Sequence, residues 1–126
     1  ETLDFSFSGL KTAVINYLNT KSQKGEEINK ADVAASFTHT VVDAIKSKVE
    51  LAFKKTGYKC IVLAGGVSAN THIRKGIEEV CKKYKAKFYA PEISLCGDNA
   101  AMIGAQGYYE LLSGNIADEG LNAFPS

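Results

Sequence analysis

The chain has 126 residues, a formal net charge of +1 and a hydrophobic content of 45%. This length suits one domain, and the balanced charge excludes a global electrostatic attraction to nucleic acid while leaving room for a local basic patch. No apolar run is long enough to predict a membrane span. The cysteines, Cys60, Cys81 and Cys96, have neither zinc-site nor disulfide-framework spacing, which predicts reduced thiols in a cytoplasmic protein.

Two amphipathic helices are predicted in the first half of the chain. Apolar residues at helical spacing place the first helix at about residues 8–20, and a polar linker follows it. The second helix is longer, about residues 30–55, because an apolar residue recurs every four positions from Val33 to Phe53. Gly57 is predicted to end this helix, since glycine adopts the left-handed backbone of a helix terminus at low cost.

The second half of the chain is predicted to alternate strands with helices. In chain order these elements are a strand at residues 59–64, a helix at 71–84, a strand at 87–90 and a helix at 100–112. Strand, helix and strand are typical of a right-handed βαβ unit with parallel strands, so loops 65–70 and 92–99 should meet at one edge. The expected fold class is α/β, helix-rich with a short βαβ unit.

The predicted sheet is incomplete, because two strands are too few for a stable sheet. The chain also starts at Glu1 rather than at a methionine, and the first helix follows almost at once. We therefore expect a piece of a longer protein. The missing strands would come from the absent part or from a neighbouring copy, so the isolated chain is expected to self-associate.

The loop after the first strand is the first candidate site. Gly65 and Gly66 would let the backbone approach a ligand, and the start of the following helix offers free N–H groups to an anion or a polar ligand edge. The loop has neither the G-x-G-x-x-G spacing of a dinucleotide site nor a P-loop lysine. The alternative is a plain strand-to-helix connection whose Ser68 or Asn70 caps the helix.

The turn before the last helix, Cys96-Gly97-Asp98-Asn99, is the second candidate site. Asp98 is interpreted either as a carboxylate ligand for a metal or as an N-cap or first-turn acid that complements the helix dipole. Asn99, like Asn70, either offers its amide to a ligand or caps a helix. His39 and His72 are too far apart for an H-x-x-x-H or H-E-x-x-H pair, which excludes a self-contained zinc hydrolase.

Basic residues gather on the helix at 71–84 and just after it. They are Arg74, Lys75, Lys82, Lys83, Lys85 and Lys87. The simpler interpretation is a solvated helix face. The alternative is contact with an RNA backbone, which would make binding depend on salt.

Three segments together resemble one family. They are residues 4–13 (DFSFSGLKTA), 63–70 (LAGGVSAN) and 95–103 (LCGDNAAMI), and they occur in the family's order and spacing. The family is that of the tRNA N6-adenosine threonylcarbamoyltransferases, formerly called O-sialoglycoprotein endopeptidases or glycoproteases. The resemblance implies that residues 1–126 form the C-terminal part of a ribonuclease-H-like lobe of the actin-like ATPase and sugar-kinase superfamily, with the N-terminal lobe absent.

The resemblance also implies an enzymatic reaction. A threonylcarbamoyl group would move from threonylcarbamoyl-adenylate to the exocyclic amine of the adenosine next to the anticodon of a tRNA. The implied partners are threonylcarbamoyl-adenylate or ATP, tRNA and the protein partners of the transfer complex. The alternative functions are a metal-dependent sialoglycoprotein endopeptidase, which is the older label of the family, and a nucleotide-binding scaffold.

The resemblance assigns four site residues, and none beyond them is implied to be catalytic. Asn70 matches the substrate-binding asparagine, and Gly65 and Gly66 match the backbone that borders the nucleotide. Asp98 matches a ligand of one divalent metal ion, iron or zinc. The family's H-x-x-x-H pair and Ser-Gly-Gly-His-Thr phosphate loop are absent here and would lie upstream. The isolated chain is therefore expected to be inactive and to retain no metal.

Overall fold

The computed structural model describes residues 2–122 and is α/β, helix-rich with a small parallel sheet. Its elements are α1 (Ser8–Gln23), α2 (Lys30–Thr56), β1 (Cys60–Val62), η1 (Gly66–Ala69), α3 (Thr71–Tyr84), β2 (Lys87–Tyr89), η2 (Ile93–Leu95) and α4 (Ala100–Ser113), where η marks a 3₁₀ turn. All four helices and both strands that the sequence predicts are confirmed. The strands are shorter than predicted, at three residues each, although hydrogen bonds from Lys87 to Lys59 and from Leu63 to Tyr89 flank them.

The ends of the long helix follow from its flanking residues. The side-chain oxygen of Asn29 accepts hydrogen bonds from the backbone N–H groups of Ala31 and Asp32, which caps the start of α2. Gly57 ends the helix with φ +70°, and its N–H donates to the carbonyl of Phe53. This left-handed conformation favours glycine over any residue with a Cβ, so the predicted stop at Gly57 is confirmed.

The hydrophobic core lies where α2 packs against α3. Its buried members are Val49 and Phe53 from α2, and Ile73, Ile77, Val80 and Cys81 from α3. Gly76 lies at the closest approach of the two helices, because a Cβ built on it would be 2.7 Å from Cγ1 of Val42. Glycine is therefore required at this crossing by space rather than by backbone conformation.

The sheet consists of β1 and β2 in parallel register, with Ile61 opposite Phe88. The side chains of these two residues are half-buried against the α2–α3 core. Neighbouring strand residues point the other way, and Val62 and Tyr89 remain 68% and 52% exposed. One face of the sheet is thus covered, while the other is open and partly apolar.

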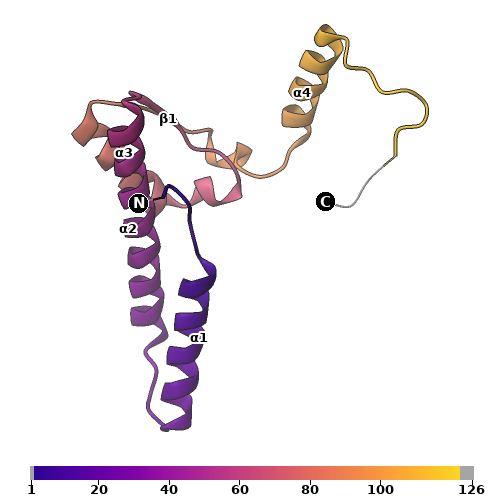
Figure 1. Ribbon diagram of the computed structural model, residues 1–126. Helices are drawn as coiled ribbons and strands as arrows, with labels where there is room; N and C mark the ends of the chain where they lie inside the picture. The colour runs from indigo at the N-terminus through magenta and orange to yellow at the C-terminus, as the bar shows by residue number, and fades with distance from the viewer. Residues whose placement is uncertain (1, 123–126) are drawn as a thin grey trace.

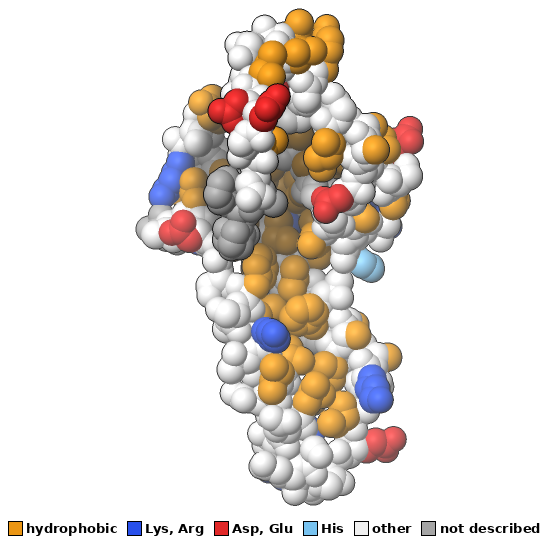
Figure 2. Space-filling view, turned by 90° about the vertical axis from the view of Figure 1, so that its right-hand side faces the viewer, with side chains coloured by type: hydrophobic (Ala, Val, Ile, Leu, Met, Phe, Trp, Pro, Cys, Tyr) orange, Lys and Arg blue, Asp and Glu red, His pale blue; other side chains and the backbone are white. Residues whose placement is uncertain are grey.

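The remaining helices lie outside this core. Figure 1 shows α1 and α2 side by side as an antiparallel hairpin, while α4 stands apart beyond the 92–99 loop. Apolar side chains are exposed in a row along the hairpin in Figure 2. Within α4 every residue is exposed except Glu110, which is half-buried. Within residues 2–122, none of the helices combines the length and the apolar character that crossing a membrane requires.

The close helix crossing makes a prediction about stability. We expect Gly76→Ala to destabilise the chain by about 1–2 kcal/mol, because the cost of overpacking against Val42 exceeds the gain in helix propensity. The measurement is the urea midpoint of unfolding. Gly107→Ala inside α4 is the matched control, since its added Cβ meets no atom within 4 Å and should not destabilise. Equal effects of both substitutions would contradict the crossing described here.

Candidate functional site

The glycine loop leaves the sheet directly after the last contact between the strands. The N–H of Leu63 donates to the carbonyl of Tyr89 at 2.8 Å, and the chain then turns into η1. Gly65 has φ +90°, which favours glycine strongly. A Cβ built on either Gly65 or Gly66 would meet no atom within 4 Å. Contacts within the described chain therefore do not explain Gly66, and the backbone at both glycines is open to a ligand.

Asn70 caps the start of α3. Its side-chain oxygen accepts hydrogen bonds from the N–H groups of His72 at 2.9 Å and Ile73 at 3.2 Å. Of the two candidate caps, the structure selects Asn70 and not Ser68. The side chain of Asn70 is exposed, and within residues 2–122 its amide NH₂ has no hydrogen-bond acceptor. Capping thus occupies the oxygen of this amide and leaves the two N–H donors for a ligand.

Ser68 is a buried residue within the glycine loop. It is only 1% exposed, and its hydroxyl finds no hydrogen-bond partner among the described residues. Its backbone N–H donates to the carbonyl of Gly65 at 2.9 Å, which holds the 3₁₀ turn. In the part of the chain that the structure describes, this buried hydroxyl oxygen is therefore left unsatisfied.

Arg74 joins the glycine loop to the 92–99 loop. Its Nε donates to the carbonyl of Ser68, and its Nη2 donates to the carbonyl of Pro91 at 2.6 Å and to Sγ of Cys96 at 3.1 Å. The prediction that Arg74 lies on a solvated or RNA-contacting helix face is therefore wrong. The side chain is half-buried because it reaches across the edge of the sheet instead of into solvent.

Two of the other basic residues of this face, Lys82 and Lys83, are paired with acids. Lys83 donates to the Glu50 carboxylate at 2.9 Å, and Lys82 lies 3.3 Å from Glu78. The hydrogen bond from Lys83 lowers the pKa of Glu50 and raises the pKa of Lys83 above its usual value. Pairing of this kind leaves less free positive charge than the sequence indicates.

Asp98 is exposed and takes no part in starting α4. The cap of α4 is Asn99, whose side-chain oxygen accepts from the N–H of Met102 at 2.9 Å and whose amide donates to the carbonyl of Gly97 at 3.0 Å. The alternative interpretation of Asp98 as the cap is therefore wrong, because the adjacent residue has the extended backbone that a cap needs. Within residues 2–122, neither a hydrogen bond nor an ion pair engages the Asp98 carboxylate.

The described residues alone do not fit a metal ion. No group of three or more His, Cys, Asp or Glu side chains in residues 2–122 could hold one. His39 lies 3.2 Å from Asp43 on α2, while His72 is exposed on α3. Asp98 can therefore supply one carboxylate ligand at most, and other ligands would have to come from outside this chain.

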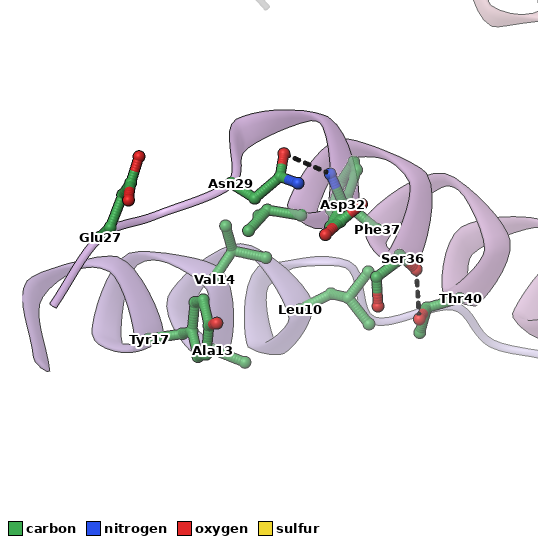
Figure 3. Close-up of a pocket in the computed structure, with 11 residues that line it drawn as sticks. Leu10, Ala13, Val14, Tyr17, Glu27, Asn29, Asp32, Ser36, Phe37 and Thr40 are labelled. Atoms are coloured by element: carbon green, nitrogen blue, oxygen red, sulfur yellow. Dashed lines mark hydrogen bonds between the residues drawn. The ribbon is translucent and has the colours of Figure 1, made fainter. Parts of the chain in front are cut away.

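A separate groove lies between α1 and α2. It has a volume of about 570 Å³, with Leu10, Val14 and Tyr17 on one wall and Phe37 on the other. Figure 3 shows Val14 of α1 directed toward α2, with Asn29, Asp32, Ser36 and Thr40 along α2. None of the four predicted site residues lines this groove.

The cap at Asn70 makes a prediction that separates its two roles. We expect Asn70→Ala to destabilise the chain by about 1 kcal/mol, because two N–H groups of α3 lose their acceptor. Asn70→Asp should preserve stability, since a carboxylate accepts the same hydrogen bonds and favours a helix N-terminus. Urea unfolding midpoints measure both, with the exposed His72→Ala as control. A stable Asn70→Ala variant would contradict the capping role.

Comparisons with known proteins place the chain. The family model described as tRNA N6-adenosine threonylcarbamoyltransferase (TsaD) matches residues 1–105. Relatives of that name from Clostridium novyi (strain NT) and Clostridioides difficile (strain 630) are 49% and 48% identical to this chain over all 126 residues. The chain spans about 37% of the length of these curated relatives. It belongs to the tRNA N6-adenosine threonylcarbamoyltransferase family.

Proposed function

We propose that this chain forms the C-terminal part of a tRNA-modifying acyltransferase. The whole enzyme moves a threonylcarbamoyl group from threonylcarbamoyl-adenylate to the exocyclic amine of the adenosine beside the anticodon. The proposal combines family membership with one structural observation. That observation is the meeting of the glycine loop and the 92–99 loop at one edge of the sheet, both held by Arg74.

The glycine loop provides the adenylate side of the proposed site. Gly65 and Gly66 present open backbone, which lets the ligand approach closely. The two N–H donors of the Asn70 amide suit acceptors on the adenosine, and the helix cap fixes the direction in which they point. The start of α3 adds a partial positive charge that favours an anionic group nearby.

Asp98 provides the second element of the proposed site. Its carboxylate is exposed, lies two residues after Cys96 and is not used by the α4 cap. We assign it as one ligand of a divalent iron or zinc ion whose other ligands lie in the part of the protein outside this chain. Because residues 2–122 contain no three-ligand group, the isolated chain should not retain the metal.

The exposed face of the sheet favours the proposal that this chain is part of a larger lobe. Val62 and Tyr89 leave one face apolar and exposed, as expected if further elements of a ribonuclease-H-like lobe cover it. We propose that the rest of the protein supplies those elements, the grip on the phosphates and the contacts to tRNA and protein partners in the cytoplasm. Alone, the chain should be inactive and should self-associate through its uncovered surfaces.

A chimeric enzyme tests this function. The 126 residues replace the matching segment of the Clostridium novyi relative, which is 49% identical over the same span. We expect the chimera to transfer threonylcarbamoyl to tRNA, and Asp98→Asn to reduce the rate by more than about 100-fold, since loss of a direct metal ligand exceeds the effect of losing its outer-shell support. The measurement is incorporation of labelled threonine into tRNA.

The control is Asp118→Asn, which changes an exposed acid in the segment after α4. This variant should transfer at the parent rate. A chimera that is folded but transfers nothing to tRNA would refute the proposed function, and cleavage of a sialoglycoprotein by it would favour the older family label. Full activity of Asp98→Asn would remove the metal-ligand role from Asp98.

A further inference from the structure

We propose that Arg74 is a positioning residue that fixes the spacing between the glycine loop and the 92–99 loop. Its effect on catalysis rests on the proposed function, while its effect on the loops does not. The inference comes from the three hydrogen bonds of its guanidinium, which reach one acceptor in the first loop, the carbonyl of Pro91 just before the second loop, and the thiol of Cys96 within it.

Three of the five N–H donors of the guanidinium are used at this junction. Nε–H is directed at the carbonyl of Ser68, and the two N–H bonds of Nη2 match the carbonyl of Pro91 at 2.6 Å and the thiol of Cys96 at 3.1 Å. None of these partners is an acid, so the arrangement is not a surface ion pair. The rigid fork of donors is specific to arginine, because a lysine ammonium carries a single nitrogen at the end of a flexible stem.

The two loops depend on this side chain. The ladder between the strands ends at the hydrogen bond from Leu63 to Tyr89. Beyond that point, the hydrogen bonds that connect residues 64–70 with residues 90–99 in the described structure all run through Arg74. Removal of the guanidinium would therefore remove the hydrogen bonds that hold the two loops to one common group, while the Asn70 cap would still attach the glycine loop to α3.

The residues that the proposed function uses lie close to the anchored atoms. Asn70 is two residues after Ser68, and Asp98 is two residues after Cys96. Because consecutive Cα atoms are about 3.8 Å apart, each of these residues lies only two such steps along the chain from a residue that Arg74 holds. A displacement of about 1 Å between groups that must act on one substrate can cost about 100-fold in rate.

The three cysteines offer a direct readout of this junction. Cys96 is 5% exposed and its thiol contacts Arg74, whereas Cys81 is buried in the α2–α3 core and Cys60 is exposed. Alkylation of Cys96 reports release of the 92–99 loop. Alkylation of Cys81 reports opening of the core, and alkylation of Cys60 reports whether the open face of the sheet stays covered in the chimera.

The experiment uses the chimera described above, with iodoacetamide as the probe and peptide mass spectrometry to follow each cysteine. Arg74→Gln and Arg74→Lys are compared with Lys75→Gln, which removes a positive charge from the next, exposed position of α3. We expect both Arg74 variants to raise the rate of Cys96 alkylation at least about tenfold, because hydrogen bonds that close the loop are lost. Cys81 should stay protected, and Lys75→Gln should match the parent.

Kinetics of the same proteins test the consequence for catalysis. In Arg74→Lys, kcat for transfer should fall at least about tenfold, whereas KM for tRNA should stay unchanged, as expected when alignment and not tRNA binding is lost. Unchanged Cys96 alkylation, parallel exposure of Cys81, or an unchanged kcat in the Arg74 variants would each overturn the proposal. If the parent chimera itself transfers nothing, the proposed function fails, and the alkylation contrast still decides whether Arg74 holds the loops.

Discussion

The packing of α3 is the constraint on which the rest of this structure depends. One face of the helix supplies most of the buried core, including Val80 and Cys81, and presses against α2 at Gly76. Its first residues are held by the Asn70 cap, and its next turn carries Arg74. A single helix therefore sets the position of the sheet, of the glycine loop and, through Arg74, of the loop that precedes α4.

This arrangement links stability to the proposed chemistry. The apolar face of α3 fixes the helix on the core, so the polar groups at its start have little freedom to move. The amide of Asn70 caps the helix through its oxygen, and its NH₂ group has no acceptor among residues 2–122. Preorganisation of this kind reduces what a site must spend on ordering when its substrate arrives.

Much of the fold follows from local sequence signals, whereas the junction between the loops does not. Apolar periodicity and N-terminal caps specify α2 and α3. Gly57 ends α2 and Gly114 ends α4, each with a left-handed backbone. Asp98 and Asn99 are both residue types that cap helices. Which of them caps α4 depends on their backbone dihedral angles, and the residue types do not predict those angles. The role of Arg74 could not be predicted from the sequence, because its acceptors lie up to 22 residues away and include two backbone carbonyls. Every residue has a backbone carbonyl, so residue type does not indicate which carbonyls accept these hydrogen bonds.

The proposed function requires the two joined loops to form one wall of an adenylate site. Photolabelling of the chimera with an azido-adenosine nucleotide, followed by peptide mapping, tests this most directly. We expect the photolabel on peptides from residues 64–72 or 92–99, and we expect excess unmodified nucleotide to abolish this labelling. Label confined to the groove between α1 and α2, or absent from this chain altogether, would contradict it.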